Sequence, residues 1–255
     1  MDEQAQQQQL RQLQWEREAI ELPRSPHLLA RVYDSISDAL AALTSVLEIR
    51  DTYTYGHCRR VASLAFQLAK QLGMSELACH EIYLTGLIHD IGKVGLPDAV
   101  LHKPGSLTDE EFRQVQLHPE LGHRIVERIP HLRFALPGIL HHHEQWDGSG
   151  YQHHLRGSTI PMMARVLAVA DSFDAMTSKR SYREPLSVDE AVGRLVAGRG
   201  IQWEKGIVDQ LLLCLEHQQS DKLELVPGQA TESEHDSVYF ASINNLCRAV
   251  AALSH

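Results

Sequence analysis

Residues 82–93 read IYLTGLIHDIGK and are the most informative stretch of the chain. Ile82, Gly86 and His89 are spaced three or four residues apart, so they share one face of a predicted helix. This helix is apolar until His89 and Asp90 stand side by side. One imidazole nitrogen and one carboxylate oxygen at the same point suit a pair of divalent cations. The stretch therefore predicts a buried helix that ends at a metal-binding pair.

The sequence on both sides of this stretch is also helical in pattern. From about 51 to 217, apolar residues recur at helical spacing between Gly and Pro breaks, and no segment alternates with the period of a strand. Thr108 with Glu111, and Ser187 with Glu190, fit the capping box that opens a helix. The sequence predicts an all-α bundle with a metal centre in its core and an N-terminal helical appendage.

Further histidines lie on inward faces of predicted helices. A helix expected from about 57 places His57 on the same face as Val61 and Leu68. His118 ends a helix expected over 109–118. Each of these histidines alone is weak evidence for a metal, because a buried histidine is often only a satisfied core residue.

Two more pairs of polar side chains share apolar faces. His142 and His143 follow Ile139 at i+3 and i+4, and Asp171 and Asp174 continue the apolar face of the helix predicted near 163–174. Buried carboxylates need a cation or several hydrogen-bond donors. The combined nitrogen and oxygen set, without thiolates, favours an open catalytic site over a closed structural zinc site.

Composition restricts the class of protein. The chain has 255 residues and a net charge of −9, which argues against binding to duplex nucleic acid. Its 4 cysteines form no CxxC pair, and the N-terminus resembles no signal peptide. No stretch approaches the roughly 18 apolar residues of a membrane span. We therefore expect a cytoplasmic protein with no membrane partner.

Three regions are expected along the chain. Residues 1–49 form an N-terminal helical segment, 50–217 the catalytic domain, and 218–255 a polar linker with a short helix. Apolar residues at heptad-like spacing between 29 and 47 leave two interpretations open, a coiled coil that forms a homodimer or a helix packed on its own domain. No sensor domain is recognisable, so the source of the regulatory input also stays open. It could be these helices, a signalling protein partner or the level of substrate.

Three motifs together resemble one known family. HDIGK at 89–93, HHE and WDGSGY within 142–151, and ADSFDAMTSKRSYR at 170–183 are similar to the HD-GYP branch of the HD-domain phosphohydrolases, over roughly residues 50–210. The resemblance implies a helical bundle that hydrolyses cyclic di-GMP, or in some members cyclic GMP-AMP, by metal-activated hydroxide. Carried over position by position, it implies metal ligands at His57, His89, Asp90, His118, His142, His143 and Asp171.

Two positions depart from the family pattern. Members with three metals have a Glu four residues before the first ligand, but this chain has Tyr53, so we expect two divalent ions bridged by Asp90. Iron or manganese is favoured, and zinc, nickel or magnesium would also fit. The GYP signature reads Gly-Tyr-Gln here, and Gln152 removes the fixed φ of proline, so we expect a more mobile loop.

The same resemblance guides the assignment of residues that contact the substrate. Lys93, one turn after His89, is expected to pair with a phosphate oxygen or to protonate the leaving oxygen, which makes it catalytic together with Asp90. Tyr151 offers a stacking face or a hydroxyl donor. Arg180 and Arg183 suit phosphates or guanine edges. Asp174 is placed with them as a substrate-binding residue.

The remaining histidines are expected to lie outside the site. His141 is taken as an indirect contributor at most. Solvated surface positions are expected for His80, His102, His123, His131, His153, His154, His217, His235 and His255.

Two alternative functions stay open. A general HD phosphohydrolase acting on another nucleotide would share the HD pair, although the Gly-Tyr-Gln loop and the two arginines argue against it. A catalytically weak receptor for a cyclic dinucleotide would explain Tyr53 and Gln152 as early losses. Against this, every ligand of a two-metal site is present in the sequence. The final product, a linear dinucleotide or a mononucleotide, is not decided by the sequence.

Overall fold

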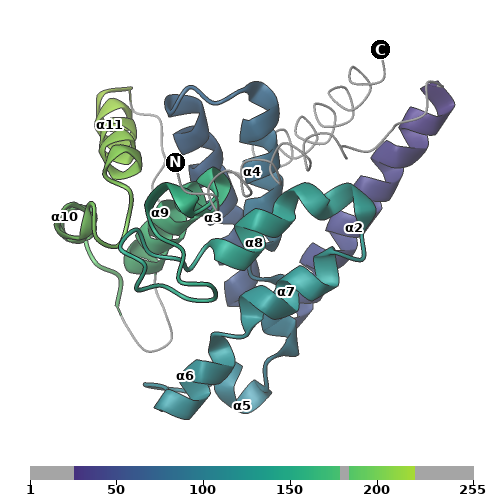
Figure 1. Ribbon diagram of the computed structural model, residues 1–255, viewed down its shortest axis with the longest axis horizontal. Helices are drawn as coiled ribbons and strands as arrows, with labels where there is room; N and C mark the ends of the chain where they lie inside the picture. Colours follow the sequence, from purple (N-terminus) through teal and green to yellow (C-terminus); the bar gives the residue numbers. More distant parts are fainter. Residues whose placement is uncertain (1–25, 179–183, 222–255) are drawn as a thin grey trace, which may run out of the picture.

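The computed structural model describes residues 26–178 and 184–221, and within these ranges it is helical throughout (Figure 1). The helices are α2 (Pro26–Arg50), α3 (Thr52–Gln71), α4 (Glu76–Ile88), η1 (Ile91–Gly95), α5 (Asp98–Leu101), α6 (Asp109–Val115), α7 (His118–Val126), η2 (Pro130–Ala135), α8 (Leu136–His141), η3 (Gly157–Thr159), α9 (Met162–Thr177), α10 (Val188–Gly198) and α11 (Lys205–Asp221). An isolated bridge between Arg199 and Trp203 is the only β pairing in these ranges. The all-α prediction is confirmed.

Helix starts follow the capping signals of the sequence. The capping boxes that open α6 and α10 are both formed, as predicted. The helix expected from about 57 begins earlier, at Thr52, because the side chain of Asp51 accepts a hydrogen bond from the Tyr53 backbone N–H. His57 therefore lies well inside α3.

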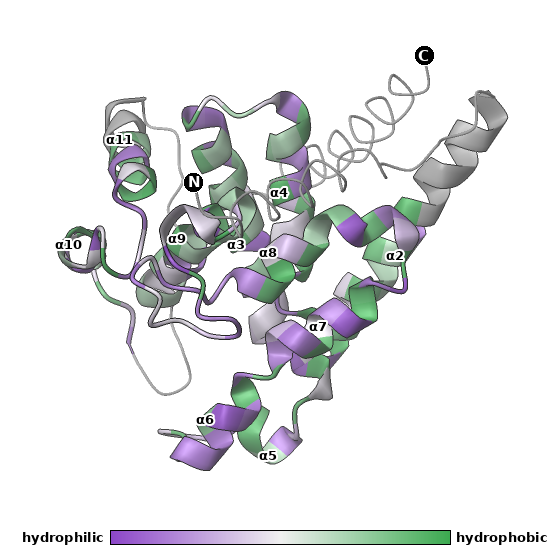
Figure 2. Ribbon diagram, viewed as in Figure 1, coloured by the Kyte–Doolittle hydropathy of each residue, from purple (hydrophilic) through white to green (hydrophobic). Residues whose placement is uncertain are grey.

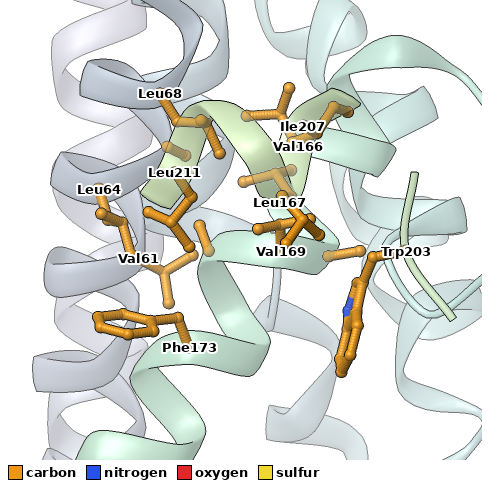
Figure 3. Close-up of a cluster of buried hydrophobic side chains, with 14 of the residues drawn as sticks. Val61, Leu64, Leu68, Val166, Leu167, Val169, Phe173, Trp203, Ile207 and Leu211 are labelled. Atoms are coloured by element: carbon orange, nitrogen blue, oxygen red, sulfur yellow. The ribbon is translucent and has the colours of Figure 1, made fainter. Parts of the chain in front are cut away.

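The first part of the core joins three helices that are distant in sequence. Val61 and Leu68 of α3 pack with Phe173 of α9 and Leu211 of α11 (Figure 3). All four side chains are almost fully buried. Burial of each such side chain contributes about 1.5–3 kcal/mol. This packing fixes α9, which carries Asp171, against α3, which carries His57.

The second part of the core lies against α2. Leu40 and Leu47 of this helix are fully buried together with Tyr83 of α4 and Ile139 of α8. The second half of α2 therefore packs along the bundle (Figure 1), as expected for a helix on its own domain. Residues 1–25 and 222–255 lie outside the described residues, so the homodimer and the three-region division stay predictions. Among the helices described here, none is long and apolar enough to cross a membrane.

The connection between α6 and α7 differs from the prediction. The helix expected over 109–118 ends at Val115, and His118 is instead the first residue of α7. Pro119 has no N–H to donate to the carbonyl of Val115, so the helix cannot continue through it. That carbonyl accepts a hydrogen bond from Nδ1 of His118 at 2.7 Å. Figure 2 shows that α6 is mostly hydrophilic, and it has no buried residue.

Candidate metal centre

The fold brings together all seven side chains predicted as metal ligands. They come from the middle of α3, the end of α4, the start of α7, the end of α8 and the middle of α9. Two groups have ligand atoms that all lie within 4.8 Å of one another. The first group is His57, His89 and Asp171, and the second is Asp90, His118, His142 and His143.

A close backbone approach positions the second group. A Cβ atom on Gly92 would lie 1.8 Å from the carbonyl oxygen of His118, so only glycine fits there. The glycine of the HDIGK motif thus allows η1 to touch α7. This contact places His118, at the start of α7, beside Asp90, which lies in the turn between α4 and η1.

Three of the imidazoles are oriented by their own backbone. His89, His118 and His142 each donate a hydrogen bond from Nδ1 to the carbonyl oxygen three residues earlier, at 2.7 or 2.8 Å. Because Nδ1 carries the proton in these bonds, the neutral ring presents the lone pair of Nε2 to the centre. This arrangement is typical of metal-binding histidines.

His57 is oriented by a carboxylate instead. Its Nδ1 donates to Oδ2 of Asp174 at 2.7 Å, and its Nε2 lies 3.0 Å from Oδ1 of Asp171. Asp174 is 1% exposed, and Arg60 donates to both of its oxygens at 2.7 and 3.1 Å. A chain of three side chains therefore links Arg60 to the orientation of His57.

Asp90 belongs to the second group and also faces the first. Its Oδ2 is 3.6 Å from Nε2 of His89 and 3.9 Å from Nε2 of His57. Its Oδ1 is 3.1 Å from Nε2 of His118 and 4.0 Å from Nε2 of His142. Each oxygen of one carboxylate thus faces a different group of imidazoles.

Several atoms of the centre are poorly satisfied by the protein alone. Nε2 of His89 and Oδ1 of Asp90 are buried without an aligned hydrogen-bond partner. Nε2 of His118 and Nε2 of His142 are 3.2 Å apart, although both rings use Nδ1 as donor. Two facing lone pairs at this distance are unfavourable unless a proton or a cation lies between them. The residues therefore fit divalent metal ions.

The charges of the centre suit metal binding. Burial alone would raise the pKa of Asp90, but Lys93, His89 and His118 hold it well below its usual range, so the carboxylate stays ionised. Burial lowers the pKa of His143 to about 3, which keeps this imidazole neutral. For His57, hydrogen bonds to carboxylates outweigh burial and raise the pKa to about 9. A metal must therefore displace a proton from His57 at neutral pH.

Lys93 lies at the edge of the centre. Its Nζ is 2.5 Å from Oδ2 of Asp90, and its side chain is one-quarter exposed. Burial lowers the pKa of Lys93, but the Asp90 carboxylate more than compensates, and the net pKa is raised. The ammonium group therefore keeps its proton beside the centre.

The Gly-rich loop folds back on the end of α8. The ring of Tyr151 stacks on His143 with centroids 4.9 Å apart, and the Gln152 amide donates to the carbonyl of Gln116. A Cβ on Gly150 would lie 2.3 Å from the backbone nitrogen of Gln145. Gly150 is therefore needed because the loop contacts its own backbone. The greater mobility expected from Gln152 stays a prediction.

The substrate residues predicted from the sequence have different outcomes. Arg180 and Arg183 lie outside the described residues. Asp174 is buried behind His57 rather than open to a ligand, because His57 and Arg60 occupy its carboxylate. Tyr53 is 37% exposed, and its ring is parallel to that of His57 with centroids 6.4 Å apart.

The surroundings of the centre include residues that the sequence pattern did not predict there. Arg60 was missed, although it follows His57 by three residues and thus shares its helix face. Glu144 was also missed: it accepts hydrogen bonds from the backbone N–H groups of His153 and Leu155 at 2.7 and 3.1 Å. His80 was expected on the surface but is 5% exposed, because Phe66 packs against its ring.

Comparison with known proteins is consistent with this geometry. A family model described as "HD domain" matches residues 41–203. The chain is 40% identical over 181 residues to a cyclic di-GMP phosphodiesterase of Thermotoga maritima, which covers 70% of this chain and 49% of that protein. It is 36% identical over 188 residues to 3'3'-cGAMP-specific phosphodiesterase 2 of Vibrio cholerae, which covers 73% of this chain and 36% of that protein. The chain thus spans half or less of the length of these relatives.

A solved structure shares the fold. The match to Bd1817, an HDG"Y"P protein from Bdellovibrio bacteriovorus, has a TM-score of 0.55 and 21% sequence identity, and it covers 74% of this chain and 62% of that one. At this level of identity, the match concerns the helical arrangement.

Proposed function

Because the chain belongs to the HD domain family, we propose that it is a metal-dependent phosphodiesterase that hydrolyses a cyclic dinucleotide, with cyclic di-GMP as the favoured substrate. The observation that carries this proposal is the convergence of anchored imidazoles on the two oxygens of Asp90. The names of the relatives in Thermotoga maritima and Vibrio cholerae support the class of substrate.

We propose two divalent ions, with iron or manganese favoured by the nitrogen and oxygen ligands. Asp90 would be shared between them, because its two oxygens face different groups of ligands. One ion would be held by His57, His89 and Asp171, and the other by His118, His142 and His143. When bound, the ions would polarise the scissile phosphate as Lewis acids and would lower the pKa of water, so that hydroxide is available for attack at neutral pH.

The chain's own residues complete the proposed site. Lys93 keeps its proton beside Asp90, so it is placed to meet a phosphate oxygen or to protonate the leaving oxygen. Tyr151 is held against His143 and offers its hydroxyl or ring edge to the substrate. Arg180 and Arg183 keep their proposed role at phosphates or guanine edges.

Asp174 receives a different role from the one predicted. Its contacts with His57 and Arg60 support a positioning residue that fixes the tautomer and the direction of the His57 ring. Substrate contact is not part of this role, since the carboxylate is buried.

A second substrate has support from the relatives. Cyclic GMP-AMP differs from cyclic di-GMP in one base only, and the Vibrio cholerae relative named for it is 36% identical to this chain. The metal centre would serve both substrates, so the discrimination would lie with groups that contact the bases.

The test is turnover by the purified full chain. The protein is stripped of metal with a chelator, reloaded with Mn²⁺ or Fe²⁺ without oxygen, and incubated with cyclic di-GMP or cyclic GMP-AMP. We expect the metal-loaded protein to release the linear dinucleotide or mononucleotides, and the stripped protein to release none. Tight binding of cyclic di-GMP by the loaded protein without any product would show a receptor instead.

A further inference from the structure

A second group of metal-binding side chains lies outside the centre. His141, Glu144 and His153 each offer a ligand atom, and these atoms lie within 4.8 Å of one another. Nδ1 of His141 is 3.8 Å from Oε1 of Glu144, and the rings of His141 and His153 have centroids 5.2 Å apart. None of these residues belongs to the group around Asp90.

Two of these three side chains are largely buried, and one of them has an unsatisfied nitrogen that a cation would bind. The side chain of Glu144 is fully buried, that of His141 is 14% exposed, and His153 is exposed. Nδ1 of His141 is shielded from solvent and has no hydrogen-bond partner. A buried nitrogen without a partner is unfavourable in a folded protein. A bound cation would satisfy its lone pair.

Glu144 retains the capacity to bind a cation. Each of its oxygens accepts one backbone hydrogen bond, from His153 or from Leu155. An ionised carboxylate has about four lone-pair positions, so about two stay available. The same bonds keep His153 close to Glu144.

The distances suit a first-row ion. With bonds of about 2.0–2.2 Å to nitrogen and oxygen, one ion can join atoms up to about 4.2 Å apart. The 3.8 Å between His141 and Glu144 fits without a backbone shift. Two imidazoles and one carboxylate favour borderline cations such as Zn²⁺ over Mg²⁺ or Ca²⁺.

We propose that His141, Glu144 and His153 bind one Zn²⁺-like divalent cation at a site separate from the centre around Asp90. His141 is the last residue of α8, and His153 follows Tyr151 in the loop. The ion therefore joins the Tyr151 loop to the helix that precedes His142 and His143. The site does not depend on the proposed hydrolysis of a cyclic dinucleotide.

The test compares three forms of the full chain in equilibrium dialysis against buffered Zn²⁺, with metal content measured by mass spectrometry. His153→Ala removes one ligand from an exposed position and should leave folding intact. His154→Asn is the matched control, because residue 154 has a φ of 53°, which asparagine tolerates. We expect the wild type and His154→Asn to bind one more equivalent of Zn²⁺ than His153→Ala.

Hydrogen exchange provides a readout that is independent of the metal count. Zn²⁺ should slow exchange of the backbone N–H groups of His153 and Leu155 by about tenfold or more in the wild type, because the ion fixes their acceptor, Glu144. It should have no such effect in His153→Ala. Equal zinc content in the wild type and His153→Ala would overturn the proposal. Equal loss of zinc in His154→Asn would also overturn it, because the loop would then bind zinc only adventitiously.

Discussion

The two groups that meet at Asp90 are oriented by different means. In the group with His118 and His142, these two rings are each fixed by a backbone carbonyl three residues earlier, and the third ring, that of His143, stacks on Tyr151. In the group with His57 and Asp171, the His57 ring is fixed by Asp174, which is 117 positions away in sequence. Local structure thus orients His118 and His142, whereas tertiary packing of α9 on α3 orients His57.

This difference determines how each group can be disturbed. A backbone carbonyl cannot be removed by substitution, so the rings of His118 and His142 keep their direction in any simple variant. The direction of His57 depends on the side chains of Asp174 and Arg60. Substitutions outside the centre should therefore weaken one metal position and spare the other.

The largest effect should come from the carboxylate that both groups share. Asp90→Ala removes the oxygens that face His89 and His118, so two cations would lose their common negative ligand. We expect hydrolysis to be abolished and at least one metal position to be empty, as measured by turnover and metal analysis. Full turnover with full metal content in this variant would mean that the centre is wrongly assigned.

Loss of an arginine beyond α9 should affect substrate but neither metal group. Arg180→Ala and Arg183→Ala should each cost about 1.5–3 kcal/mol of transition-state binding, or roughly ten- to a hundredfold in kcat/KM. Metal content and melting temperature should stay unchanged. Unstable variants with near-normal kcat/KM per folded molecule would show that these arginines stabilise the fold instead.

Asp174→Asn should weaken metal binding in one of the two groups and leave it unchanged in the other. The amide cannot accept from both His57 and Arg60 as the carboxylate does. We expect one ion to bind about ten- to a hundredfold more weakly, as for other partners of ligand histidines, while the second ion is retained. Competition with a chelator measures both affinities. Unchanged metal affinities with a raised KM would instead support the substrate contact predicted from the sequence.

Arg60→Met should act on the same metal position more weakly. Arg60 contacts Asp174 rather than a ligand, and its side chain is one-quarter exposed, so water can replace part of its hydrogen bonding. We expect the affinity of one ion to fall by less than about tenfold, below the effect of Asp174→Asn. A larger loss than that of Asp174→Asn would contradict the proposed order of contacts.

The smallest effect should come from the loop. Gln152→Ala removes the hydrogen bond to the Gln116 carbonyl, a neutral bond with a net contribution of about 0.5–1.5 kcal/mol. We expect metal content to be unchanged and KM for cyclic di-GMP to rise by less than about tenfold. Loss of metal in this variant would show that the loop supports the centre directly.

The sequence predicted the positions of the candidate ligands better than their surroundings. Helical spacing placed His57, His142 and Asp171 on inward faces, because the periodicity of a buried helix is a local property. The break between α6 and α7 depends on Pro119. The sequence pattern placed His118 at the end of the first helix, whereas it begins the second. Asp174 was placed on the inward face, but its contacts with His57 and Arg60 were not predicted.

Neighbours across the fold could not be predicted from spacing. The contact of Asp174 with His57 requires the packing of α9 on α3, and the contact of Gly92 with His118 requires the approach of η1 to α7. Both contacts join elements that are far apart in the sequence. Helix periodicity carries no information on such pairs.

The most direct test of the account is an anomalous-scattering map from crystals of the full chain loaded with Mn²⁺. We predict two peaks within about 4 Å of each other, one beside His57 and His89, the other beside His118 and His142, with Asp90 between them. A single peak, or a further peak beside Tyr53, would contradict a two-metal centre bridged by Asp90.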